Sequence, residues 1–305
     1  MANKKTLIAI VGPTAVGKTA MAISLAQHFK TEIISADSRQ FYKEMSIGTA
    51  KPNSDELIAV KHHFIDSHGI TQDYSAGDFE REALLKLEEL FQRHDVVILV
   101  GGSGLFVRAL CEGLDDLPKA GDEVRERLNT EMAKFGLEVM KERLKSIDPV
   151  YFQNADIDNP QRVVRALEVF EATGNPMSFY HKKDVEKRPF DILTIGLNMD
   201  RTLLYERINL RVDMMMDAGL LDEVTALLPF RTKPALLTVG YAELFDYLDG
   251  KLSLEEAVDK IKQNSRRYAK RQITWFKKYG NTHWFHPSEL SEIIKFVHTS
   301  IEKAS

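Results

Sequence analysis

The chain opens with a short apolar run that leads into a glycine-rich segment. Residues Thr6–Val11 are mostly apolar and directly precede Gly12, which predicts a buried β-strand. The next segment carries Met21, Leu25 and Phe29 at helical spacing, which predicts an amphipathic helix. The order strand, loop, helix is typical of the start of an α/β domain.

Three further apolar runs have the length of buried strands. Residues 32–36 and 96–100 each end in polar or glycine residues, and residues 191–197 form a fourth candidate strand. Continuous apolar strands separated by helical segments predict a parallel sheet with helices on both faces. We therefore expect an α/β fold built on a doubly wound parallel sheet.

The middle of the chain has a different residue composition. Residues 118–188 are charged and rich in helix formers, with proline-containing breakers such as Asn159-Pro160. We expect a mostly helical insertion there, which divides the core into residues 1–117 and 189–305. From Arg201 onward the pattern is again helical.

One helix of the insertion has predicted ends. Asn159 is a candidate N-cap, and Gly174 is a candidate stop. Between them, Val163, Leu167 and Phe170 form an apolar stripe.

Composition narrows the possible classes of protein. The 305 residues are 44% hydrophobic and carry a formal charge of −4, which argues against a uniformly basic protein that coats nucleic acid. Residues 260–280 are an exception, because they contain eight Lys or Arg and no Asp or Glu. Cys111 is the only cysteine, so no intramolecular disulfide can form. With no signal-peptide pattern and no apolar stretch long enough for a bilayer, we expect a cytoplasmic protein. We also expect it to be a monomer.

The glycine-rich segment matches the P-loop pattern G-x-x-x-x-G-K-[ST]. Backbone N–H groups of such a loop converge on phosphate oxygens, its lysine neutralises charge, and its final hydroxyl can bind Mg²⁺. The predicted phosphate ligands are Gly12, Pro13, Thr14, Ala15, Val16, Gly17, Lys18 and Thr19, with Thr19 as the metal ligand.

A P-loop alone does not name the reaction. Many NTP-hydrolysing P-loop proteins place an acidic Mg²⁺ ligand at the end of a second apolar strand. Here residues 96–100 lead instead into Gly101-Gly102-Ser103-Gly104, which lowers the odds of a motor or switch NTPase. A small-molecule kinase remains possible.

A carboxylate follows the second predicted strand. Asp37 comes directly after the apolar residues 33–36, and strand ends in open α/β sheets face the ligand crevice. Asp37 could accept a proton from an attacking amine, hold Mg²⁺ through water, or cap the following segment. We favour the general base, with capping as the main alternative.

Six motifs along nearly the whole chain carry a resemblance. They are GPTAVGKT, SADSRQFY, VGGSGLF, RVVRALEV, VGYAEL and YAKRQITWF. In this order they resemble the bacterial tRNA dimethylallyltransferase (isopentenyltransferase) family. The resemblance implies transfer of a dimethylallyl group from dimethylallyl diphosphate to N6 of the adenosine that follows the anticodon, with release of diphosphate and no consumption of ATP.

The resemblance also implies roles for single residues. Asp37 would be the base toward N6, and Lys18, Thr19 and Arg211 would attend the diphosphate and its Mg²⁺. Arg211 is placed only through its R-x-x-x-R spacing with Arg207.

Transfer to a tRNA base requires a channel that receives a flipped nucleotide. The tRNA contacts that the resemblance implies are Asp37, Ser38, Arg39, Gln40, Ser103, Arg125, Gln161, Arg162, Val163, Val164 and Arg165. We also expect tRNA contacts at Gly240, Tyr241, Lys270, Arg271, Gln272 and Trp275, because the basic residues of this region can meet phosphates and Trp275 can stack on a base. Arg125 could equally lie on a solvated helix face. The chain departs from the family pattern at Ser103 and Phe106, where Thr and Tyr are usual, and at a less basic approach to the QRVVR helix.

Two groups of residues can be explained by a structural role instead of a functional one. Ile261, Tyr268 and Trp275 recur every seven residues, a pattern that is also typical of a core-facing stripe, so the basic residues around them are the better RNA ligands. Adjacent His62 and His63 point to different sides in any regular structure and are interpreted as structural or loop residues.

Three alternative functions stay open at this stage. A small-molecule kinase would bind ATP at the P-loop and use Asp37 as its base. A prenyltransferase that acts on free adenine nucleotides would not need the insertion. A nucleotide-dependent RNA-binding switch would need the missing strand-end carboxylate.

Overall fold

The computed structural model describes residues 5–115, 117–118, 120–181, 187–278 and 281–304. The chain forms two compact units, one of residues 1–112 and 187–305 and the other of residues 113–186. The sequence placed these boundaries a few residues later, at 117/118 and 188/189. Among the described residues, no helix is both long and apolar enough to cross a membrane.

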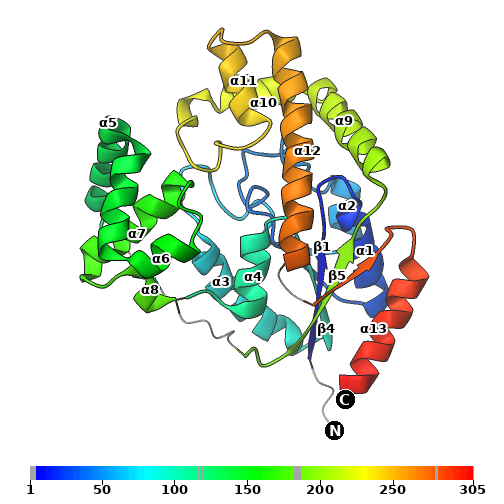
Figure 1. The fold of residues 1–305 in the computed structure, drawn as a ribbon. Helices are drawn as coiled ribbons and strands as arrows, with labels where there is room; N and C mark the ends of the chain where they lie inside the picture. The colour runs from blue at the N-terminus through cyan, green and yellow to red at the C-terminus, as the bar shows by residue number, and fades with distance from the viewer. Residues whose placement is uncertain (1–4, 116, 119, 182–186, 279–280, 305) are drawn as a thin grey trace. The chain divides into compact units, whose positions relative to one another are not determined.

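The larger unit is built on a six-stranded sheet in the order β3-β2-β4-β1-β5-β6 (Figure 1). All paired strands run parallel. The strands are β1 (Thr6–Val11), β2 (Ile33–Ser35), β3 (His62–His63), β4 (Val96–Val100), β5 (Asp191–Leu197) and β6 (Thr282–Phe285). The expected α/β class and parallel sheet are confirmed.

Two strands were not predicted. β3 has only two residues, both of them histidines, and β6 (THWF) is short and begins after a basic helix. Neither offers the apolar run that reveals a buried strand, because both lie at the ends of the sheet.

Successive residues of the central strands face two different cores. On β1, Leu7 and Ala9 belong to one cluster, whereas Ile8 and Ile10 belong to the other. This period of two is what a strand buried on both faces requires. The sheet is therefore doubly wound, as expected.

Helices from both halves of the unit cover the two faces. The N-terminal half supplies α1 (Lys18–Phe29), α2 (Ser54–Ala59), α3 (Ala76–Phe91) and α4 (Gly104–Glu112). The C-terminal half supplies α9 (Arg201–Asp217), α10 (Leu220–Ala226), the 3₁₀ turn η1 (Leu228–Phe230), α11 (Tyr241–Leu248), α12 (Leu254–Lys278) and α13 (Leu290–Ala304). The long α12, orange in Figure 1, packs against α4, α9 and α11.

The smaller unit is helical and has its own apolar core. It contains α5 (Asp122–Ile147), α6 (Pro149–Asn154), α7 (Pro160–Thr173) and α8 (Met177–Tyr180). α5 is interrupted at Gly136, whose φ of 81° is incompatible with a continuous helix. The predicted ends of α7 are confirmed, because Asn159 accepts a hydrogen bond from the Gln161 N–H and Gly174 adopts a left-handed conformation.

Candidate active site

The P-loop connects β1 to α1 at the carboxyl edge of the sheet. Gly12 has a φ of 143°, and a Cβ at this position would lie 2.5 Å from the Leu197 carbonyl oxygen. Gly17 has a φ of 107° and precedes the first turn of α1, which has no side-chain cap. The N-terminal N–H groups of α1 are thus left available for an anion.

Lys18 folds back over the loop that precedes it. Its Nζ donates to the carbonyl oxygens of Gly12 at 3.0 Å and Pro13 at 2.8 Å. Burial lowers the pKa of Lys18 to about 8, a shift that the carboxylate of Asp37 opposes and the guanidinium of Arg211 reinforces. An anion bound here would favour the charged ammonium.

Asp37 lies where β2 and β4 leave the sheet together. The Ala36 N–H donates to the Val100 carbonyl at 2.7 Å, and a Cβ at Gly101 would lie 2.4 Å from the Ala36 oxygen. This close approach explains why β4 ends in glycines rather than in a carboxylate. Asp37 is brought to the same edge as the P-loop.

The two carboxylate oxygens of Asp37 have different surroundings. Its Oδ1 accepts a hydrogen bond from the Arg39 N–H at 3.1 Å, so the carboxylate does cap the turn that follows it. Among the described residues, its Oδ2 has no hydrogen-bond partner. The capping alternative and a role toward a ligand are therefore compatible.

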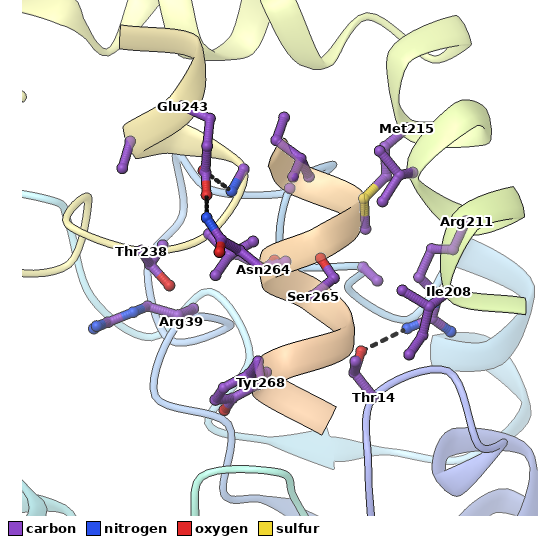
Figure 2. A pocket seen from close by; sticks show the side chains of 18 of the residues that line it. Thr14, Arg39, Ile208, Arg211, Met215, Thr238, Glu243, Asn264, Ser265 and Tyr268 are labelled. Atoms are coloured by element: carbon purple, nitrogen blue, oxygen red, sulfur yellow. Dashed lines mark hydrogen bonds between the residues drawn. The ribbon is translucent and has the colours of Figure 1, made fainter. Parts of the chain in front are cut away.

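A pocket of about 490 Å³ opens beside these groups (Figure 2). Its polar lining includes Thr14, Asp37, Arg39, Arg211 and Arg271. Its apolar lining includes Ile208, Val212, Met215, Val239 and Ile261. The pocket thus has residues suited to anion binding on one part of its lining and apolar side chains on another.

Arg211 reaches the pocket from α9. Its Nη1 donates to the Thr14 hydroxyl at 3.4 Å, the contact drawn as a dashed line beside Ile208 in Figure 2. Burial lowers the pKa of Arg211, and the nearby positive charge of Arg207 acts in the same direction. The expected placement of Arg211 next to the P-loop is seen in the structure.

Gln272 of α12 joins the P-loop to the glycines after β4. Its Oε1 accepts from the Thr14 N–H at 2.8 Å, and its Nε2 donates to the Gly102 carbonyl at 2.9 Å. The side chain is only 5% exposed. The tRNA contact expected for Gln272 stays a prediction, and both ends of its amide are already used inside the protein.

Other expected RNA ligands are also buried. Tyr241 is completely buried, and its hydroxyl donates to Glu223 at 2.5 Å. Val163 and Val164 lie in the core of the smaller unit. The tRNA contacts expected for these three residues stay predictions, and their side chains are turned toward the protein's own cores.

Trp275 is used in packing as well. A Cβ at Gly104 would lie 2.3 Å from the Trp275 ring, so the indole rests directly on that glycine. Trp275 is also packed against the core, as is the fully buried Ile261. The core-facing stripe therefore describes Ile261 and Trp275, whereas Tyr268 lines the pocket.

Several expected RNA ligands are engaged in contacts that shape the site. Ser38 and Ser103 bond to each other, with the Ser38 N–H donating to Ser103 Oγ at 2.9 Å and Ser103 Oγ donating to Ser38 Oγ at 3.1 Å. The Gln40 amide donates to the carbonyls of Thr49 and Ala50. These bonds hold the segment after β2 in place.

Gly240 is placed by a small network at the far end of the pocket. Its N–H donates to Glu243 at 2.8 Å, and Glu243 also accepts from the Asn264 amide at 2.7 Å (Figure 2). Sequence reasoning did not identify Glu243 or Asn264. Glu243 caps its own helix through the Gly240 N–H, whereas Asn264 comes from α12, so no local pattern brings these two side chains together.

The expected RNA ligands with exposed side chains fall into two groups. On α12, Lys270 and Arg271 are exposed, and Arg271 also lies over the Tyr268 ring at 5.7 Å. In the smaller unit, Gln161 and Arg162 are exposed. These four side chains keep the accessibility that an RNA contact needs.

Arg125 and Arg165 are committed elsewhere in the smaller unit. Both pair with Glu168, a buried carboxylate, at 3.5 and 3.1 Å. Arg165 also donates to the Pro118 carbonyl. Arg125 nevertheless stays exposed.

His62 and His63 do different things, as their adjacency in β3 requires. His63 Nε2 bonds to Glu32 at 2.6 Å, which makes it a structural residue. His62 Nδ1 bonds to the Val60 carbonyl at 2.8 Å, and burial lowers the pKa of His62.

Comparison with known proteins identifies the family. A family model described as IPP transferase matches residues 40–279. A tRNA dimethylallyltransferase of Christiangramia forsetii is 51% identical over 94% of this chain and 95% of its own, and one of Cytophaga hutchinsonii is 50% identical over 98% of each.

Solved structures agree with this relationship. The full-length tRNA isopentenylpyrophosphate transferase of Bacillus halodurans has a TM-score of 0.74 at 38% identity, over 98% of each chain. A eukaryotic dimethylallyltransferase, described as acting on tRNA, has a TM-score of 0.77 at 28% identity over 94% of this chain and 75% of its own. Matches over nearly the whole chain, in sequence and in fold, show that this protein belongs to the IPP transferase family.

Proposed function

We propose that this protein transfers a dimethylallyl group from dimethylallyl diphosphate to N6 of the adenosine on the 3′ side of the anticodon in tRNA. The relatives are named for this activity. The observation that carries the residue assignment is that one pocket is lined by Asp37, by Thr14 of the P-loop and by Arg211. A base and an anion site thus share one chamber.

The P-loop would hold the diphosphate of the donor. An allylic diphosphate reacts when charge developing on its leaving group is neutralised by cations and by backbone dipoles. Lys18 and Arg211 would supply the cations, and the N–H groups at the start of α1 would supply the dipoles. Each lies at the pocket or next to it.

The P-loop offers an oxygen ligand that suits Mg²⁺. It is the hydroxyl of Thr19 in the first turn of α1, and a hydroxyl is a hard ligand. Among the described residues there is no cluster of three or more His, Cys, Asp or Glu that could hold a metal. This fits Mg²⁺, which keeps several waters and takes other ligands from substrate phosphates. The ion would add positive charge at the leaving group, with Thr19 as its ligand.

The chemical step needs one base. As the N6–C1 bond forms, the C1–O bond to diphosphate breaks and its electron pair leaves with the diphosphate. The proton on N6 passes to the carboxylate of Asp37. An exocyclic adenine amine is a weak nucleophile, so a positioned carboxylate that accepts its proton would lower the barrier.

The apolar lining would protect the reacting carbon chain. Ile208 and Met215 of α9 lie on the Arg211 side of the pocket (Figure 2), and Val212 of the same helix also lines it. They could contact a five-carbon group and exclude water from an electrophilic intermediate. Water excluded in this way cannot hydrolyse the donor.

The acceptor proposal rests on basic residues that stay exposed. Lys270 and Arg271 of α12, and Arg162 of the smaller unit, could bind tRNA phosphates. A tRNA substrate also fits the cytoplasm, where Cys111 would remain reduced.

An assay with two acceptors tests the proposal. Labelled dimethylallyl diphosphate is incubated with Mg²⁺ and either unmodified tRNA or AMP, without ATP. We expect label in tRNA alone. Label in AMP would instead indicate a free-nucleotide prenyltransferase, and label in neither would return a P-loop kinase to first place.

A further inference from the structure

Asp37 also lines a second, much smaller cavity. Its volume is about 30 Å³. Its polar lining consists of Lys18, Thr19, Ser35, Asp37, Gln40 and His62. Asp37 is the only one of these residues that also lines the large pocket. A group bound in the small cavity could therefore act on Asp37 without entering the substrate pocket.

His62 enters this cavity from the edge strand β3, which pairs with β2 through Ile33. Its Nδ1 lies 2.8 Å from the Val60 carbonyl oxygen. A carbonyl can only accept, so Nδ1 carries the hydrogen and the neutral ring keeps a lone pair on Nε2.

His62 Nε2 is buried and has no hydrogen-bond partner among the described residues. Buried polar atoms in native proteins nearly always have a partner, which can be an ordered water. The adjacent His63 is satisfied by Glu32, so the missing partner is particular to the ring that lines the cavity.

The cavity suits a single water molecule. A space of about 30 Å³ admits one water but not a phosphate or a base. A buried water commonly makes two to four hydrogen bonds. The lone pair of His62 and the carboxylate of Asp37 are both acceptors, so one water can donate a hydrogen to each.

We propose that the small cavity holds one ordered water that donates to His62 Nε2 and to Asp37, so that His62 is a positioning residue for the Asp37 carboxylate. The role of Asp37 as base rests on the proposed function above. With Oδ1 held by the Arg39 N–H and the carboxylate also bound by the water, rotation of the side chain is restricted. The base is then pre-oriented toward the large pocket.

Crystallography of the enzyme tests the water itself. We expect one density peak roughly 3 Å from His62 Nε2 that also lies within hydrogen-bonding distance of Asp37. In His62→Phe this peak should be absent. An empty cavity in the wild type would overturn the proposal, and so would a Mg²⁺ ion with oxygen ligands at about 2.1 Å in the place of the water.

Kinetics test the effect on Asp37. We expect His62→Phe to lower kcat about tenfold or more with little change in KM for tRNA, because a hydrogen bond to a charged group is lost. His62→Gln, which can place an acceptor near the position of Nε2, should recover most of the activity. The control is His94→Phe. His94 Nε2 is also buried without a hydrogen-bond partner among the described residues, with Glu32 at 3.9 Å, but it precedes β4 at the opposite edge of the sheet.

A double-mutant cycle separates positioning from general damage. If His62 acts through Asp37, His62→Phe should cost less than about twofold when Asp37 is already Asn. An equal loss in both backgrounds would contradict the proposal, as would full activity of His62→Phe. If His62→Phe fails to fold, the wild-type water and the activity of His62→Gln still decide. Failure of the proposed function would appear differently, as a wild-type protein that prenylates nothing.

Discussion

Asp37 illustrates how much one residue depends on its immediate surroundings. Only Ala36 separates it from the end of β2, its Oδ1 caps the local turn, and it lines both cavities. Its charge also contributes to raising the pKa of the Tyr268 hydroxyl to about 12, although burial is the larger cause. The charge of Asp37 thus affects the pKa values of neighbouring groups, among them Tyr268 and Lys18.

The first prediction concerns the base. Asp37→Asn removes the proton acceptor while keeping the size of the side chain. Turnover at saturating substrates should fall by about 10²- to 10⁴-fold, the usual contribution of a general base, with the Kd for tRNA nearly unchanged. Asp55→Asn, at an exposed carboxylate of α2, should have wild-type kinetics. A large loss of tRNA affinity in Asp37→Asn would make Asp37 a binding residue instead.

The position of a residue in the site could be predicted from sequence where it depends on neighbours in the chain. The P-loop and Asp37 depend on neighbours in the chain, so motif and strand-end reasoning placed them at one edge of the sheet. Gln272 depends on Thr14, 258 positions away, and no local pattern could distinguish a buried clasp from an RNA ligand. The burial of Tyr241 could not be predicted for the same reason, since its partner Glu223 lies in another helix.

At the scale of elements, α12 carries out two tasks with two faces. One face packs Ile261 and Phe276 into the core, and the opposite face exposes lysines and arginines. Gln272 lies on the buried face and fixes the P-loop through the Thr14 N–H. The element that offers charges to RNA therefore also shapes the diphosphate site.

The second prediction tests this clasp. Gln272→Leu keeps approximate volume but leaves the Thr14 N–H and the Gly102 carbonyl without their partner. We expect KM for dimethylallyl diphosphate to rise at least severalfold while the Kd for tRNA stays within twofold, because the loop loses a bond worth about 1 kcal/mol or more. Gln263→Leu, at an exposed position of the same helix, is the control. Weakened tRNA binding with unchanged donor kinetics would restore Gln272 as an RNA ligand.

A second element, α10, holds the segment after β2 through Glu223. The Glu223 carboxylate accepts from the N–H groups of Ser46, Ile47 and Gly48 at 2.7 to 3.0 Å and from the Tyr241 hydroxyl. A Cβ at Gly48 would lie 2.6 Å from the Tyr241 ring, so the backbone passes very close to that side chain.

The third prediction follows from these four hydrogen bonds. Glu223→Ala should lower the free energy of unfolding by about 2–4 kcal/mol, because several partly buried donors lose their acceptor. Asp222→Ala, an exposed neighbour on α10, should cost about 1 kcal/mol or less. Denaturant unfolding monitored by circular dichroism measures both. Equal small effects would show that solvent replaces the carboxylate.

Elements were predictable to the extent that they are amphipathic or fully buried. β1, β4, β5 and α7 carry continuous apolar runs or a helical stripe, and the predicted positions agree with the structure. β3 and β6 are short edge strands. Their strand conformation depends on pairing with a neighbouring strand, and their own sequences carry no pattern that predicts it. The break in α5 at Gly136 likewise depends on a single backbone conformation.

At the scale of the molecule, charge is distributed unevenly. The net charge is −4, yet residues 260–280 contain only basic charges. Salt dependence is the physical signature of such a surface when it binds phosphates, because bound counterions are released. An average over the whole chain hides it.

The fourth prediction addresses this surface. Lys270→Ala combined with Lys277→Ala should weaken tRNA binding and reduce the slope of log K against log salt by about 1 for each lost phosphate contact. The value of kcat at saturating tRNA should not change, since neither residue lines the pocket. Lys295→Ala on α13 removes an exposed lysine outside this segment and is the control. An unchanged slope in the double variant would move the tRNA surface elsewhere.

The most direct measurement is a single-turnover reaction with enzyme in excess over unmodified tRNA, dimethylallyl diphosphate and Mg²⁺, in which prenylated adenosine and released diphosphate are quantified together. If the P-loop holds a leaving diphosphate and Asp37 receives the N6 proton, one diphosphate appears for each prenylated adenosine without any nucleoside triphosphate. A requirement for ATP, or the appearance of ADP in place of diphosphate, would contradict this assignment and make the P-loop a phosphoryl-transfer site.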